Sequence, residues 1–153
     1  MPDIQTQRWS HGRRARTVRR MITRIDPDTV PPPPRGRYSH AARVDIGAGS
    51  LLFVSGQVAL GDDGAIVGAG DMEQQAQRVF TLLERILADQ GAGFGDVVSI
   101  RTFLTDMALL PAYGAVRARY LTGPPPTSTT VEVSRLFLHE ALLEVELVAA
   151  TGG

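Results

Sequence analysis

Two carboxylates near the C-terminal end of the chain are the residues best placed to do chemistry. Glu144 and Glu146 alternate along an otherwise apolar segment, so both side chains leave one face of the strand that this segment predicts. A carboxylate among apolar neighbours can act as a general base or hold an attacking water. It can equally pair with an arginine across a subunit interface. For Glu144 both interpretations stay open, whereas Glu146 is interpreted as structural.

A run of hydroxyl side chains at residues 127–130 precedes these carboxylates. Ser128 and Thr130 within it could bind a neutral or carbonyl-bearing ligand, although threonine is also typical of the start of a strand. The chain contains neither cysteine nor lysine, which excludes thiol nucleophiles, disulfides and Schiff-base lysine chemistry. His40 and His139 lie far apart without metal-ligand spacing, so we expect no metal site.

Length and composition indicate one domain with its own core. The chain has 153 residues, of which 43% are hydrophobic. No apolar run approaches the roughly 18 residues that span a bilayer. The net charge is zero, but seven arginines and a single acid lie within residues 1–24, which leaves nine arginines against fifteen acids elsewhere. We therefore expect a cytoplasmic protein whose body binds neither membranes nor nucleic acid.

Residues 1–36 are expected to form a basic, proline-rich and flexible extension, because they show no clear apolar periodicity. They also lack the long apolar core of a secretory signal. Three interpretations compete for residues 1–24. They could be a disordered arm that binds nucleic acid or another polyanion, an artefact of the gene start with Met21 as the true beginning, or a short ordered extension.

Apolar periodicity and turn residues predict an α+β fold in which two helices cover one face of a mixed sheet. The first helix is expected to begin after Asp71, an N-cap with Gln74 three residues on, and to end before Gly91. The second should begin near Pro111 and reach about residue 121. Strands are expected at residues 40–46, 51–57, 97–105, 129–136 and 142–150.

The last predicted strand has two different faces. Its odd-numbered residues, 143–149, are all apolar and are expected to lie under the helices. Its even-numbered residues, 142–150, combine apolar side chains with the two glutamates. A similar mixed face on the earlier strand is formed by Val97, Ser99, Arg101, Phe103 and Thr105. A sheet face that is half apolar and half charged is a candidate surface for assembly.

A proline-led segment carries a family resemblance. Residues 124–136 (Pro-Pro-Pro-Thr-Ser-Thr-Thr-Val-Glu-Val-Ser-Arg-Leu) resemble the Pro-Ala-Arg-Ser-x-Val-x-Val-x-x-Leu signature of the reactive-intermediate deaminase (Rid, YjgF) family. Shorter motifs agree in order and spacing: Gly-Arg-Tyr at 36–38, Val-Ser-Gly-Gln at 54–57, the helix start at 71–75, Gly-Asp-Val-Val at 95–98, Phe-Leu-Thr-Asp at 103–106 and Glu-Val-Glu at 144–146. The resemblance covers residues 37–150.

This resemblance implies a single chorismate-mutase-like domain over residues 37–151 that assembles as a homotrimer. Three sheets would form a central barrel, with a small-molecule cleft at each subunit interface. In the family such a cleft hydrolyses an imine or enamine to a 2-oxo acid and ammonia, with neither metal nor organic cofactor. By position, Glu144 would place the attacking water, and the cleft would be lined by Tyr38, Ser55, Gly56, Gln57 and Thr130.

Two positions depart from the family pattern. Ser128 stands where the signature arginine binds the substrate carboxylate, and Gly114 stands where many members have an asparagine. Losing a charge-assisted contact at a buried site typically costs about 2–5 kcal/mol. Arg37 and Arg101 are therefore considered as replacement cations, although a salt bridge is the alternative interpretation for each.

The sequence thus favours a Rid-like hydrolase or deaminase that acts on a small reactive imine, enamine or carbonyl intermediate. Without the signature arginine, its substrate is expected to lack the usual free carboxylate. The alternative is a non-catalytic homotrimer that binds a small molecule or acts like a chaperone. A third hypothesis makes the basic arm the functional part, in a protein associated with nucleic acid.

Overall fold

The computed structural model describes residues 21–152, which form one mixed sheet with two helices packed against it. The helices are α1 (Met72–Asp89) and α2 (Leu110–Tyr120), and short 3-10 turns lie at Pro34–Gly36, Phe94–Asp96 and Met107–Leu109. The strands are β1 (Ile22–Ile25), β2 (Ala41–Ile46), β3 (Gly49–Gln57), β4 (Val97–Leu104), β5 (Thr127–Glu132) and β6 (Leu143–Thr151). The expected α+β architecture is confirmed.

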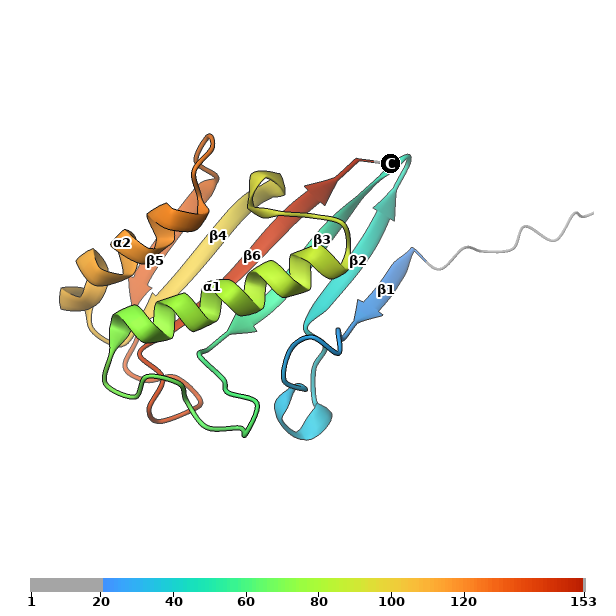
Figure 1. The fold of residues 1–153 in the computed structure, drawn as a ribbon. Helices are drawn as coiled ribbons and strands as arrows, with labels where there is room; N and C mark the ends of the chain where they lie inside the picture. The colour runs from blue at the N-terminus through green and yellow to red at the C-terminus, as the bar shows by residue number, and fades with distance from the viewer. Residues whose placement is uncertain (1–20, 153) are drawn as a thin grey trace, which may run out of the picture.

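The strand order β1-β2-β3-β6-β4-β5 places the last strand of the chain near the middle of the sheet. Neighbouring strands are antiparallel except β4 and β5, which run parallel. A parallel pair needs a crossover on one face of the sheet, and α2 supplies it. Figure 1 shows α1 lying along the sheet and α2 beside β5, at the edge opposite β1.

The core lies between the helices and one face of the sheet. The apolar side of α1 is buried there, and the alternate residues of β6 complete the core as expected: Leu143, Val145, Leu147 and Ala149 are each at most 2% exposed. An aromatic stack joins the two helices, because the Phe80 ring centre lies 4.9 Å from that of Tyr120 and 6.1 Å from that of Tyr113.

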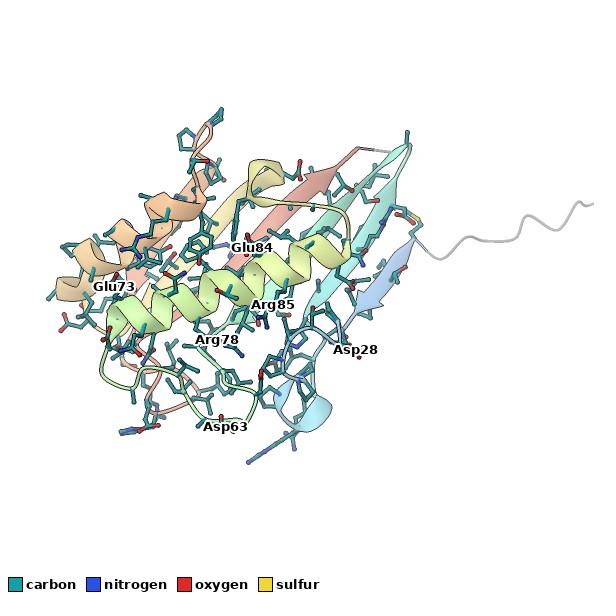
Figure 2. All side chains as sticks on the ribbon, in the orientation of Figure 1. Asp28, Asp63, Glu73, Arg78, Glu84 and Arg85 are labelled. Carbon is teal, nitrogen blue, oxygen red and sulfur yellow. The ribbon has the colours of Figure 1, made fainter. Side chains whose placement is uncertain are left out.

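The outer side of α1 is charged. Glu73, Glu84 and Arg85 are exposed there, and Figure 2 shows these side chains along the helix. A two-sided helix of this kind covers a sheet while facing water. Within residues 21–152, no helix is both long enough and apolar enough to cross a membrane.

The ordered sheet begins earlier than the sequence suggested. We expected a flexible extension to residue 36 and a domain that starts near Tyr38, but β1 lies inside that extension and pairs with β2. Ile25 joins the main core, and the Asp45 N–H donates to the Met21 carbonyl at 2.9 Å. The strand has only four residues and is preceded by many arginines, which masked its alternation. The remainder of the predicted extension, residues 1–20, lies outside the described residues.

Two strands differ from their predicted shape. β5 ends at Glu132, although the sequence predicted a strand to residue 136. In β4 the pairing with β6 shifts register between Val97 and Ser99. This irregularity turns Val97 into the core, at 9% exposure, and leaves Val98 48% exposed. Val97 therefore does not share the mixed face on which the sequence placed it, and a bulge of this kind breaks the alternation on which the prediction depended.

The N-terminus of α1 allows a test of local stability. Asp71 Oδ1 accepts a hydrogen bond from the Gln74 N–H at 3.0 Å, and the Gln74 amide donates to Asp71 Oδ2 at 2.8 Å. These bonds, the backbone bond first, lower the pKa of Asp71. The native state thus favours the ionised carboxylate, whose stabilisation is lost as the pH falls through that lowered pKa.

Asp71→Ala is therefore expected to lower the urea midpoint at neutral pH, and this loss should shrink as the pH falls through the lowered pKa of Asp71. Asp89→Ala is the matched control, because Asp89 lies at the opposite end of α1, where a negative charge is unfavourable. An equal loss for both variants at neutral pH would contradict the capping role of Asp71.

Candidate functional site

Glu144 projects from β6 on the face of the sheet that the helices leave uncovered, and it lies against Gly56 of β3. A β-carbon at position 56 would sit 2.9 Å from Glu144 Cγ and 2.7 Å from Cδ. Such distances are too short for a real side chain, so the Glu144 carboxylate keeps this place only while residue 56 is glycine. The sequence grouped these two residues in one site, and the structure brings them together.

A bulge in β3 creates this contact. The pairing of β3 with β6 shifts register between Val54 and Gln57, so Ser55 and Gly56 interrupt the ladder. An inserted residue bends the strand and re-aims its neighbours. Here it brings the backbone of Gly56 next to Glu144.

The side chains of Ser55 and Gln57 are used inside the protein. Ser55 Oγ donates to the Ser39 carbonyl at 2.7 Å, and its N–H donates to the His40 carbonyl at 2.8 Å. Gln57 is 5% exposed, and its amide donates to the Ser55 carbonyl at 3.0 Å. Both residues flank Gly56, and the hydrogen bonds of Ser55 hold the segment that carries Tyr38.

His40 and Asp26 complete this support, which no local sequence pattern predicts. The buried His40 ring has Nε2 at 2.8 Å from the Pro31 carbonyl, and the His40 N–H donates to Asp26 Oδ1 at 2.8 Å. The Tyr38 ring stands edge-on to the His40 ring, with centres 6.3 Å apart. Sequence reasoning considered histidine only as a metal ligand, because contacts that join distant segments have no local signal.

The electrostatics of Glu144 and Tyr38 are linked. Burial, and then the charge of Glu146, raise the pKa of Glu144. Burial, then the charge of Glu144 and then that of Asp26, raise the pKa of Tyr38. Glu144 therefore takes up a proton more readily than an ordinary carboxylate, and the Tyr38 phenol remains a hydrogen-bond donor.

A hollow of about 550 Å³ lies on the uncovered face beside these residues. Its lining includes Tyr38, Phe53, Arg101, Glu146 and, unforeseen from the sequence, Arg24 of β1. Arg24 went unnoticed because it was grouped with the basic extension. Within residues 21–152, no group of three or more His, Asp or Glu side chains is placed to hold a metal ion.

The two cations considered as replacements do not reach Ser128 within the chain. Arg101 Nε lies 3.2 Å from Glu146 Oε1, so the salt-bridge interpretation holds for Arg101. Arg101 pairs in register with Thr129, the neighbour of Ser128, so it points to the opposite face of the sheet from Ser128. Arg37 is exposed and makes no ion pair with residues 21–152.

Ser128 and Thr130 form a second group, away from Glu144. They pair with Ile100 and Thr102, whose side chains are buried under the helices, so they face the helix side of β5. Strand β4 lies between β5 and β6, which places those two strands about 10 Å apart. The predicted site is thus divided between two faces of the sheet. Arg117 of α2, which sequence reasoning missed, donates from Nη1 to Ser128 Oγ at 2.9 Å.

Comparisons with known proteins agree with the fold. The chain matches the family model described as Endoribonuclease L-PSP over residues 29–151. It is 39% identical to Protein DfrA of Myxococcus xanthus over 119 residues, 78% of this chain and 89% of that protein. It is 32% identical to the 3-aminoacrylate deaminase RutC of Acinetobacter baylyi over 118 residues, 77% of this chain and 90% of that protein. The crystal structure of YyfA from Yersinia pestis, a protein of unknown function of the conserved Rid protein family, superposes with a TM-score of 0.75 at 28% identity, covering 86% of this chain and 99% of that one.

The raised pKa of Glu144 predicts how stability changes with pH. Because the pKa of Glu144 is higher in the folded than in the unfolded chain, the native state binds the proton more tightly. Stability is therefore lost as the pH rises from the unfolded-state pKa through the folded-state pKa. Glu144→Gln is therefore expected to raise the thermal midpoint at neutral pH. The gain should disappear as the pH falls below the ordinary carboxyl range.

Glu140→Gln serves as the control, since Glu140 is exposed and a surface substitution should leave the midpoint nearly unchanged at every pH. A lower midpoint for Glu144→Gln at neutral pH would show instead that a cation, such as an arginine of another copy, pairs with Glu144 in the assembled protein.

Proposed function

Since this chain belongs to the Rid (YjgF) family, we propose that it is a hydrolase that deaminates a small reactive imine or enamine, or acts on a related carbonyl intermediate. The observation that carries the proposal is the state of Glu144. This carboxylate is half-buried against Gly56, its pKa is raised, and it makes no ion pair with residues 21–152. A carboxylate held in this way takes up a proton more readily than an ordinary carboxylate, as a general base requires.

The reaction is the replacement of nitrogen by oxygen. Glu144 takes a proton from water while the water oxygen bonds to the imine carbon, and the C=N electron pair moves to nitrogen, which receives that proton from Glu144. The hydroxyl proton of the resulting carbinolamine then moves to nitrogen as the C–N bond breaks. The products are a carbonyl compound and ammonia. An enamine first takes a proton at carbon and becomes the imine.

Tyr38 and Gly56 position the reacting groups. The raised pKa of the Tyr38 phenol keeps it protonated, so its O–H can donate to the ligand or to the attacking water. Gly56 leaves the space that the Glu144 carboxylate occupies. Tyr38 does not need to change its protonation state during the reaction.

A homotrimer would complete the site by joining its two halves from neighbouring copies. Tyr38 and Glu144 lie on the uncovered face, whereas Ser128 and Thr130 lie on the helix side of the edge strand β5. The uncovered face also carries apolar side chains in contact with water, such as Phe53 at 47% exposure. Such patches favour burial by another subunit.

The substrate specificity is proposed to differ from that of family members that have the signature arginine. Ser128 offers a neutral hydroxyl where an arginine would offer a planar, charged pair of donors. Among the relatives, RutC of Acinetobacter baylyi is named for 3-aminoacrylate, an enamine, which supports the class of substrate and leaves the individual compound open. A non-catalytic, ligand-binding homotrimer is the alternative.

Turnover by Glu144→Gln separates these functions. In an assay that follows the hydrolysis of several imines, both carboxylate-bearing ones formed by an amino-acid oxidase or a dehydratase and uncharged ones, we expect the unmodified protein to accelerate hydrolysis of at least one. Glu144→Gln keeps the shape and removes the base, so the rate should fall by about 100- to 10,000-fold. Light scattering should give a trimer mass for both samples. Glu140→Gln should match the unmodified protein.

No acceleration by the unmodified protein across several imines would favour the binding alternative. Full activity of an intact Glu144→Gln trimer would remove Glu144 from the mechanism. Loss of the trimer in that variant would assign Glu144 to assembly, where an unpaired interfacial charge is costly.

Gly56→Ala tests the position of the carboxylate without removing it. The new methyl group would collide with the Glu144 side chain, whose flexible end can move aside. We expect turnover to fall about a hundredfold through misplacement, with stability changed by less than about 1 kcal/mol. The double variant Gly56→Ala/Glu144→Gln should be no slower than Glu144→Gln alone. Additive losses in the double variant would show that Gly56 acts independently of Glu144.

A further inference from the structure

We propose that Arg117 of α2, together with Ser128 and Thr130 of β5, binds the anionic group of the ligand, and that this group is a carboxylate. This inference deepens the proposed function and rests on it. It also replaces the expectation that the ligand lacks a carboxylate, because a cation is present at Ser128 after all, supplied by a helix and not by the strand.

The contact between Arg117 and Ser128 is direct. Arg117 Nη1 donates to Ser128 Oγ at 2.9 Å. Thr130 lies two residues further along β5, so its side chain leaves the same side of the strand. One guanidinium and two hydroxyl groups therefore border the same stretch of the sheet edge, and all three can donate hydrogen bonds to an anion.

Arg117 has no carboxylate partner among residues 21–152, whereas Arg119 has one. Arg119 Nη2 lies 2.8 Å from Glu73 Oε1, and the other ion pairs within that part of the chain involve Arg43, Arg78 and Arg101. A partly buried guanidinium that lacks a protein carboxylate is suited to receive one from a ligand, usually through two parallel hydrogen bonds.

The guanidinium is held in place before any ligand binds. Tyr113 is 1% exposed, and its hydroxyl lies 2.6 Å from Thr102 Oγ1. Burial raises the pKa of Tyr113, while hydrogen bonds from Thr102 and Arg117 and the charge of Arg117 lower it. Arg117 thus contacts the Tyr113 hydroxyl on one side and Ser128 on the other. A side chain fixed in this way loses little freedom on binding.

Gly114 leaves room beside the guanidinium. It lies three residues before Arg117, on the same side of α2, and a β-carbon there would meet no atom within 4 Å. Ser128 is small as well. The two departures from the family pattern therefore lie near the same arginine: Ser128 accepts its hydrogen bond, and Gly114 lies one helical turn before it.

The geometry also limits the kind of ligand. Arg117 is rooted in α2, and its guanidinium reaches Ser128 on the helix side of β5, the side that the side chain at position 128 faces. We therefore expect a carboxylate-bearing imine or enamine as the ligand.

The test compares two probes, 2-oxobutyrate and its uncharged methyl ester, by calorimetry on the full-length protein. We expect Arg117→Met to weaken binding of the acid by about tenfold or more while leaving the ester unchanged. Arg119→Met is the matched control, since it removes a cation from the same helix turn without touching Ser128, and it should bind both probes like the unmodified protein. Arg117→Lys should give an intermediate affinity for the acid.

Gly114→Leu provides a second, independent variant. It fills the space beside Arg117 and favours the helix, so folding should be retained, and binding of both probes should weaken. Trimer mass and thermal midpoint are measured for each variant. Equal binding of acid and ester by the unmodified protein, or unchanged acid binding in both Arg117→Met and Gly114→Leu, would overturn the proposal.

The outcome for the anion site and the outcome for the hydrolase are distinguishable. If the acid binds through Arg117 but no imine is hydrolysed, the proposal of an anion site is supported and the proposal of a hydrolase is contradicted. If Arg117→Met hydrolyses imino acids with the same kcat/KM as the unmodified protein, the proposal of a hydrolase is supported and the proposal of an anion site is contradicted.

Discussion

The placement of the Glu144 carboxylate against Gly56 is the constraint on which the rest of the site depends. A partly buried carboxylate without an ion pair in the described chain is unfavourable, and its raised pKa records this. The fold maintains it through a bulge in β3 and through the hydrogen bonds of Ser55 and His40, which fix the neighbouring segment. A carboxylate with a shifted pKa of this kind is a candidate for proton exchange, which is the role proposed for Glu144.

The strand order explains why one copy holds only half of each proposed site. Insertion of β6 between β3 and β4 brings Glu144 beside Gly56, while the crossover through α2 leaves β5 at the edge of the sheet. The Ser128 and Arg117 side chains therefore meet at that edge. A trimer would bring this edge to the uncovered face of a neighbouring copy, so catalytic and anion-binding groups would come from different chains.

Much of the fold could be predicted from local patterns, and the site only in part. The periodicity of α1 and the alternation of β6 were sufficient because each buries a continuous apolar face. The bulge at Val97 breaks the alternation expected of a strand. Strand β1 has only four residues, which is too short to show an alternation. The sequence grouped Glu144 with Gly56 through the family resemblance. It could not reveal that Arg117 approaches Ser128, because that contact depends on how α2 crosses from β4 to β5.

The short strand β1 has a consequence for how the chain behaves when it is shortened. β1 covers the outer side of β2, which is two residues longer. Without β1, the unpaired N–H and C=O groups of β2 would offer a template for other strands, the usual start of edge-to-edge aggregation. The four residues of β1, which the sequence grouped with the basic extension, thus protect the edge of the sheet. A chain trimmed to the matched family region, which begins at residue 29, would lack this strand.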